Sequence, residues 1–190
     1  MSEALAVVEL ASIARAFPVT DAMIKRAQCD LWRVGPISPG KFLIILRGGV
    51  AEVDESYRAG LDVAGDMLVD YVFLPQVDPS VPAVMRAAPA GIVVGALGIV
   101  ETSSCAATVR AADCAVKAAE VELVHMQLGR GIGGKAVFAF SGALHDVQAG
   151  LEAAIDAVGE GFLVTAEQIA APHGAMTLKM LGLGSEAPDY

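Results

Sequence analysis

The sequence predicts an α+β protein built from two tandem copies of one small domain, each with the element order βαββαβ. Three features predict this class. The chain contains an internal repeat, both copies show the same order of strand and helix periodicities, and glycine or proline separates many of the predicted elements.

The repeat has an offset of 92 residues. Eight residues between positions 8 and 31 recur unchanged at this spacing, which indicates a tandem duplication. They are Val8, Glu9, Ser12, Ala14, Asp21, Lys25, Ala27 and Leu31, which recur as Val100, Glu101, Ser104, Ala106, Asp113, Lys117, Ala119 and Leu123. After a two-residue slip the match continues, with Gly40-Lys41 recurring as Gly134-Lys135. Because insertions concentrate in loops, the slip predicts a longer loop in the second copy.

Apolar periodicity defines the elements of the first copy. Runs of strand length predict strands over residues 4–10, 31–37, 41–47 and 67–74. Apolar residues at helical spacing predict helices over 19–27 and 50–64. Pro18 fits the first turn of the former helix, Gly65 fits the end of the latter, and Pro39-Gly40 fits a hairpin turn. This order is that of a ferredoxin-like fold, in which helices cover one face of an antiparallel sheet.

The second copy has the same pattern. Strands are predicted over 96–101, 121–128, 135–141 and 162–169, and helices over 144–158 and through Asp113 and Lys117. The predicted domains span 1–78 and 94–182, and the linker over 79–93 has room for a helical turn at 81–85. A short helix is expected at 175–181 and a flexible tail at 183–190.

Composition narrows the function. The net charge is −9 and the basic residues are scattered, which argues against binding to nucleic acid. No apolar run is long enough to span a membrane, and the first residues lack the basic start of a secretion signal, so we expect a cytosolic protein. Cys29, Cys105 and Cys114 show no CxxC spacing and are expected to be reduced thiols buried in apolar surroundings.

The glycine-rich stretch from Gly129 to Gly134 formally matches the dinucleotide pattern GxGxxG. That motif requires a helix directly after the glycines, whereas a strand is predicted here, so a hairpin loop is the preferred interpretation. His125, His145 and His173 lie far apart, without a Cys or carboxylate at metal-ligand spacing. No metal site is therefore expected.

Two further residue types could suggest catalysis. Ser38 has no neighbouring base and no nucleophile-elbow context. Glu9 and Glu101 lie on apolar strands, where a structural partner is favoured over acid–base chemistry. The sequence predicts that the protein is not an enzyme.

Several motifs in combination resemble the bacterial microcompartment shell domain. They include Ile99-Val100-Glu101-Thr102, Gly131 to Lys135 and Ala171-Pro172-His173 in the second copy, and Pro39-Gly40-Lys41-Phe42 in the first. The resemblance covers almost the whole chain. Among shell proteins, the chain resembles those with two tandem domains. Within that group it resembles the trimeric type of the propanediol-utilisation shell.

The resemblance implies a homotrimer that forms a flat pseudohexagonal tile and packs with other shell proteins around enzymes in the bacterial cytoplasm. Small metabolites would cross a central pore formed by the loops between the second and third strands of each copy. The pore-lining residues would be Ile37, Ser38, Pro39, Gly40, Gly129, Arg130, Gly131, Ile132 and Gly133.

The same pore position marks a departure from those relatives. In the propanediol type a cysteine precedes Pro-Gly-Lys, and three copies hold an iron–sulfur cluster on the threefold axis. This chain has Ser38 there, and none of its three cysteines falls in the pore loops. No cofactor is therefore expected, and the pore is expected to be open.

Four residues match those through which neighbouring tiles of the family meet. Lys25 and Lys117 match the edge lysine, although an ion pair with Asp21 or Asp113 on the same helix is the alternative. Pro172 and His173 match the end of the family's Pro-Arg-Pro-His motif, but its arginine is absent. Tile contacts are therefore expected to be weaker or to need other shell subunits.

A second function class stays open at this point. Ferredoxin-like sheets often bind small effectors between subunits, so a trimeric ligand-sensing or regulatory protein is the alternative. That alternative predicts a saturable ligand and a discrete trimer that forms no sheets.

Overall fold

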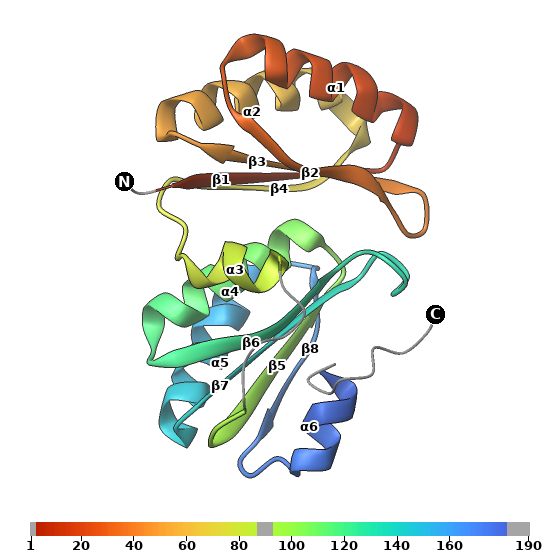
Figure 1. Cartoon of the computed structure of the whole chain (residues 1–190). Coiled ribbons are helices and arrows are strands. Elements are labelled where there is room, and N and C mark those ends of the chain that lie inside the picture. Colours follow the sequence, from red (N-terminus) through yellow and green to blue (C-terminus); the bar gives the residue numbers. More distant parts are fainter. Residues whose placement is uncertain (1–2, 87–92, 182–190) are drawn as a thin grey trace.

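A computed structural model describes residues 3–86 and 93–181 of the chain. They form two domains, one above the other in Figure 1, and each domain places two long helices on one face of a four-stranded sheet. The predicted tail at 183–190 and residues 87–92 of the predicted linker lie outside the described residues. The limits given for the domains and the linker stay a prediction.

The first domain comprises β1 (Ala4–Leu10), α1 (Ile13–Arg26), β2 (Asp30–Ile37), β3 (Lys41–Gly48), α2 (Val50–Ala64) and β4 (Leu68–Leu74). A short 3₁₀ turn, Gly65–Met67, precedes β4, and α3 (Ser80–Arg86) follows it. The strand order is β2-β3-β1-β4, and every neighbouring pair is antiparallel.

The second domain comprises β5 (Ala96–Thr102), α4 (Cys105–Ala118), β6 (Val121–Leu128), β7 (Ala136–Gly142), α5 (Leu144–Val158) and β8 (Leu163–Ile169), and α6 (Gly174–Met180) follows. Its strand order, β6-β7-β5-β8, repeats that of the first domain. The predicted fold class, two tandem ferredoxin-like domains, is confirmed.

The start of α1 corrects the sequence prediction. The helix begins at Ile13, because the Ser12 side chain accepts a hydrogen bond from the Arg15 backbone N–H at 3.2 Å and caps the first turn. Pro18 therefore lies inside the helix and not in its first turn. The helical turn predicted at 81–85 is likewise part of the longer helix α3.

β1 is buried along its whole length, because a different layer covers each of its faces. Ala6 and Val8 point to the core beneath α1 and α2. Leu5 and Val7 belong to a second core that includes Val109 of α4, so the open face of the first sheet packs against the second domain. Burial of apolar surface on both sides stabilises this central strand.

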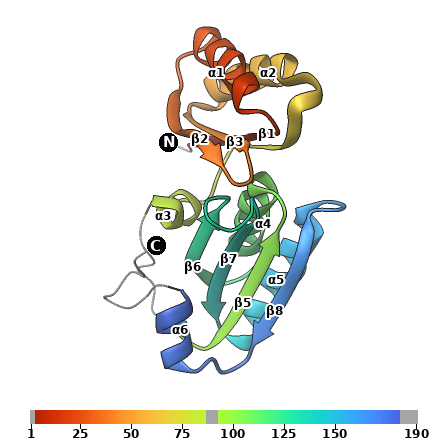
Figure 2. The ribbon, with the colours of Figure 1, turned by 90° about the vertical axis from the view of Figure 1, so that its right-hand side faces the viewer.

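The second sheet differs in what covers its open face. Figure 2 looks onto this face, with α6 crossing one end of it. There Leu97, Val124 and Ala139 pack with Met176 and Leu181 from the α6 region. None of the helices in the two described stretches is long and apolar enough to cross a membrane.

Candidate functional site

The two predicted pore loops lie on the same side of the molecule (Figure 1). The Ser38 backbone N–H in the β2–β3 loop donates a hydrogen bond to the Gly129 carbonyl oxygen at 3.2 Å. Gly134 has a positive φ and lies so close to the Ser38 carbonyl that a Cβ there would collide with it. The structure thus brings together loops that are more than 90 residues apart in the sequence.

The predicted pore residues differ in exposure. Ile37 is buried and contacts Gly129, which is buried too, so these two residues anchor the loops. Ser38 and Ile132 are half-buried. The exposed members are Pro39, Gly40, Arg130, Gly131 and Gly133. Neither loop contains a carboxylate, so Arg130 gives the exposed surface a positive charge.

The predicted edge lysines occupy matching places near the ends of α1 and α4 but make different contacts. Lys25 has a 72% exposed side chain and pairs with Asp21 at 2.6 Å. Lys117 pairs with the buried Asp113 and also donates to the Gln76 carbonyl at 2.6 Å. Lys117 therefore ties α4 to the segment between the domains.

The other two predicted edge residues lie just before α6. The Nδ1 atom of His173 accepts a hydrogen bond from the Ala175 backbone N–H at 3.3 Å and caps that helix. Pro172 is half-buried beside it. These residues lie outside the two helices that carry the lysines, and no hydrogen bond or ion pair among the described residues joins them to Lys25 or Lys117.

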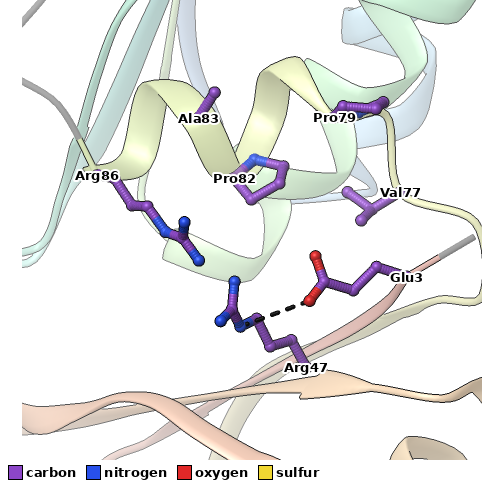
Figure 3. A pocket seen from close by; sticks show the side chains of 7 residues that line it. All are labelled: Glu3, Arg47, Val77, Pro79, Pro82, Ala83 and Arg86. Carbon is purple, nitrogen blue, oxygen red and sulfur yellow. Dashed lines mark ion pairs between the residues drawn. The ribbon is translucent and has the colours of Figure 1, made fainter.

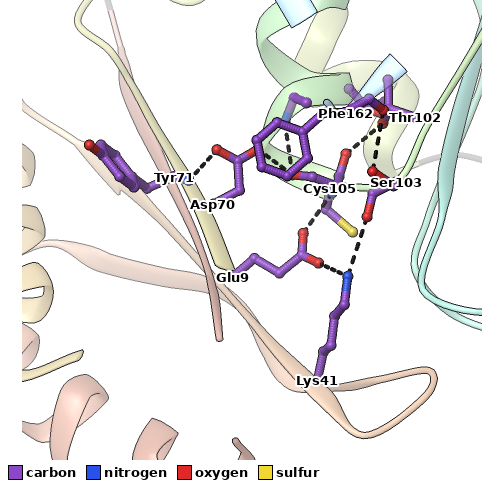
Figure 4. A network of polar contacts seen from close by, with 11 residues as sticks. Glu9, Lys41, Asp70, Tyr71, Thr102, Ser103, Cys105 and Phe162 are labelled. Atoms are coloured by element: carbon purple, nitrogen blue, oxygen red, sulfur yellow. Dashed lines mark hydrogen bonds and ion pairs between the residues drawn. The ribbon is translucent and has the colours of Figure 1, made fainter. Parts of the chain in front are cut away.

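An ion pair of the first domain makes hydrogen bonds to the second domain at the start of α4 (Figure 4). Glu9 on β1 is 0% exposed and accepts from Lys41 Nζ at 2.7 Å. The other Glu9 oxygen accepts from the Cys105 backbone N–H, also at 2.7 Å. A carboxylate at this place satisfies a free N–H of the first helical turn and interacts favourably with the helix dipole.

A second carboxylate supports the same helix end. The Ser104 hydroxyl donates to Asp70 on β4 and accepts from the Ala107 backbone N–H at 3.2 Å. Burial, and to a lesser extent the nearby Glu9 charge, raise the pKa of the Cys105 thiol far above its ordinary value, so it stays protonated.

The second domain has the equivalent Glu–Lys pair on a more exposed surface. Glu101, the repeat partner of Glu9, pairs with Lys135 at 2.8 Å, and its side chain is 31% exposed. Strand register places Thr165 opposite Glu101, where Asp70 lies opposite Glu9. Leu163 and Val164 beside them are exposed. Among the described residues, α6 crosses one end of this face, whereas the end around Glu101 has no covering helix like the one that α4 provides in the first domain.

The complementary helix is exposed as well. Phe17 and Ile13 on α1 are 70% and 42% exposed. Their repeat partners on α4, Val109 and Cys105, are both 0% exposed, because the first sheet covers them. The chain thus presents one unfilled sheet face and one uncovered helix of matching kind.

The cysteines correct part of the sequence prediction. All three are free thiols, but only Cys105 is buried, whereas Cys29 and Cys114 are half-buried. None lies in a pore loop. Throughout the part of the chain that the structure describes, no three His, Cys, Asp or Glu side chains are grouped to hold a metal ion. Ser38 supplies a hydroxyl where an iron–sulfur cluster needs a thiolate, so the loops do not fit that cofactor.

Sequence reasoning expected partners for Glu9 and Glu101 and missed the rest of the interface. The sequence did contain a signal for the lysine partners, because a glutamate and a lysine recur together in both copies, as Glu9 with Lys41 and Glu101 with Lys135. Asp70 had no such signal, since its counterpart is Thr165.

These features define a protein of two equivalent domains in which the sheet of the first domain binds helix α4 of the second. The model of the BMC domain family matches residues 4–77 and again residues 96–172. The chain belongs to the BMC domain family.

Named relatives agree. The bacterial microcompartment shell protein PduT of Citrobacter freundii is 41% identical over 182 residues, which cover 95% of this chain and 99% of that protein. The carboxysome shell protein CsoS1C of Hydrogenovibrio crunogenus is 39% identical over 97 residues, 50% of this chain and 91% of that protein. The crystal structure of a microcompartment protein from Desulfitobacterium hafniense has a TM-score of 0.81 at 38% identity and covers 93% of this chain and 99% of its own.

Proposed function

We propose that this chain is a structural shell subunit of a bacterial microcompartment in the bacterial cytoplasm. Its family and its similarity to a named shell protein over nearly the whole length support this role. The shell role is structural and not catalytic. A ligand-sensing or regulatory trimer is not favoured, because the relatives of known role are shell proteins.

One observation carries the assembly mode. Within a chain, the open face of the first sheet binds the start of α4 through Glu9, while the equivalent face around Glu101 and the equivalent helix α1 stay uncovered. A second copy of the chain offers the helix that this face lacks. Such head-to-tail contacts close into a ring when the rotation permits, and three two-domain chains supply the six domains of a pseudohexagonal tile.

The repeat specifies the contacts between subunits. By analogy with Glu9 and Cys105, Glu101 would accept a hydrogen bond from the Ile13 backbone N–H of the next chain. Phe17 would enter the place that Val109 fills within the chain. Burial of an aromatic side chain of this size contributes about 2 kcal/mol per interface.

In this tile the paired hairpin loops of each chain would meet at the axis and line a pore for small metabolites. Ser38 hydroxyls, backbone N–H groups of the glycine-rich loop and Arg130 would form its rim, so small neutral or anionic molecules would pass more readily than cations. No iron–sulfur cluster would close the pore, because the loops contain no cysteine.

At the edge of the tile, Lys25 is better placed than Lys117 to contact a neighbouring tile, since Lys117 already bonds to Asp113 and Gln76 within the chain. Other shell proteins would meet the tile at Lys25.

Phe17→Asp tests the assembly. We expect the unchanged protein to have the mass of three chains of 19.5 kDa in light scattering and to form flat arrays in electron micrographs. Phe17→Asp would put a charge into the interface and give single chains with an unchanged circular dichroism spectrum. Ile155→Asp, a matched change at a 40% exposed site on α5, should remain trimeric. A trimeric Phe17→Asp variant, or an unchanged protein that is monomeric at all concentrations, would refute this mode of assembly.

A further inference from the structure

A cavity of about 480 Å³ lies between the first domain and α3. It is lined by Glu3, Arg47, Val77, Pro79, Pro82, Ala83 and Arg86 (Figure 3). Arg47 is near the end of β3, whereas Lys41 at the start of that strand adjoins the pore loop. The cavity is therefore at the opposite end of the sheet from the proposed pore and is a separate site.

Two arginines flank the only tryptophan of the chain beside this cavity. The guanidinium carbon of Arg47 lies 5.6 Å from the centre of the Trp32 ring, and that of Arg86 lies 5.2 Å from it. Cation–π contacts of this kind hold the two charged groups in place. They come from β3 and α3, so the site forms only when α3 is docked.

The charges of the two arginines are balanced differently. Arg47 pairs with Asp30 at 2.9 Å and makes a longer contact with Glu3 at 3.5 Å. Arg86 makes no ion pair or side-chain hydrogen bond with the residues that the structure describes. In Figure 3 the guanidinium groups of Arg47 and Arg86 point toward each other, and the Glu3 carboxylate lies beside Arg47. An anion beside the arginines would supply the counter-charge that Arg86 lacks among the described residues, whereas Arg47 is already paired.

We propose that this cavity binds a small carboxylate with a short apolar tail. Arginine pairs well with carboxylates, because its N–H groups match the two oxygens in one plane. The apolar lining residues Val77, Pro79 and Pro82 would cover the tail. This site is independent of the pore and of the trimer axis.

Trp32 provides the measurement, since it is the only tryptophan of the chain and two arginines of the cavity lie over its ring. Sodium butyrate is titrated into the full-length protein at constant ionic strength, kept with sodium chloride. We expect a saturable change in emission. Arg86→Gln should weaken the binding at least about tenfold, because it removes one of the two charges. Arg58→Gln, a control at an exposed arginine paired with Asp54 on α2, should leave the titration unchanged.

Sodium phosphate is titrated in the same way to separate a carboxylate with a tail from an anion in general. Binding of phosphate as tight as that of butyrate would overturn the proposal. So would the absence of a saturable change in the unchanged protein, or an equal response in Arg86→Gln. The mass in light scattering, measured on the same samples, reports separately on the proposed trimer.

Discussion

Glu9 and Glu101 show how one residue takes two roles in a duplicated chain. They occupy equivalent positions on β1 and β5. Glu9 pairs with Lys41, the first residue of β3, and Glu101 pairs with Lys135, the residue before β7. Glu9 is fully buried because α4 covers it, whereas Glu101 stays partly exposed. A buried ion pair adds little net stability, but loss of one partner leaves a charge without compensation.

We therefore predict that Glu9→Gln and Glu101→Gln differ in cost. Glu9→Gln leaves the Lys41 ammonium without a counter-charge at the domain interface and should lower the free energy of unfolding by about 2–3 kcal/mol. Glu101→Gln should cost less than about 1 kcal/mol in a single chain, since its pair is exposed. Denaturant unfolding of both variants in the Phe17→Asp background measures this difference. Equal costs would contradict the burial argument.

His125 is expected to make the stability of the folded chain depend on pH. Burial lowers the pKa of its imidazole below the ordinary value of 6.5, and a hydrogen bond with the Leu181 backbone opposes this only in part. Its Nδ1 atom has no hydrogen-bond partner among the described residues. The unfolded chain takes up a proton that the folded chain resists, so stability is full above the ordinary pKa and falls as the pH drops below it.

We expect His125→Gln to reduce the loss of melting temperature between about pH 7.5 and about pH 5.5, because no imidazole then has to remain neutral. His145→Gln, at an exposed site on α5, should retain the pH dependence of the unchanged protein. Differential scanning fluorimetry at the two pH values measures it. The same loss in all three proteins would rule out His125 as the cause.

At the scale of elements, α1 and α4 are equivalent helices with different surroundings. Both begin after a serine that caps the first turn. At the position of Pro18, α4 has Arg110, which donates to the carbonyls of Ala157 and Val158 at the end of α5. Pro18 has no N–H to bond the Ala14 carbonyl, so α1 is the weaker helix of the pair.

Pro18→Ala should therefore stabilise the chain. The substitution restores a backbone donor inside α1, and because Pro18 is exposed it leaves the core unchanged. We expect a gain of about 1–3 kcal/mol, the cost of proline in a helix interior. Thermal unfolding in the monomeric Phe17→Asp background checks it. An unchanged or lower melting temperature would show that the helix has adapted to the missing hydrogen bond.

At the scale of the whole molecule, the proposed trimer brings three Ser38 side chains to one axis. This arrangement needs three chains, because each chain contributes Ser38 only once. A hydroxyl is a poor ligand for iron, whereas a thiolate is the ligand that iron–sulfur clusters use. In the proposed tile, the residue at this position would decide between an open pore and a pore closed by a cofactor.

Ser38→Cys is predicted to introduce cluster binding. After anaerobic reconstitution with iron and sulfide, the variant should show broad visible absorption and about one cluster per three chains, since three thiolates then meet at the axis. The unchanged protein, treated alike, should show none, and Ala149→Cys, at an exposed position on α5, serves as a control thiol away from the loops. A stoichiometric cluster in the unchanged protein would contradict the open pore.

The sequence by itself determined the repeat, the order of the elements and the family. These follow from patterns local to each element or from the match between Glu9, Ser12 and their counterparts Glu101 and Ser104. Local patterns failed at Pro18, where a serine cap upstream overrode the proline signal. They also failed for Cys29 and Cys114, because apolar neighbours in sequence do not decide how deeply a thiol is buried.

Only the tertiary structure decided which repeat surfaces are filled. Glu9 and Glu101 are alike in sequence, yet packing of the first sheet on α4 buries one and leaves the other open. The same packing brings Ser38 to Gly129 and sets Arg86 beside Trp32. Such contacts join residues tens of positions apart through the path of the chain, so no periodicity within one element encodes them.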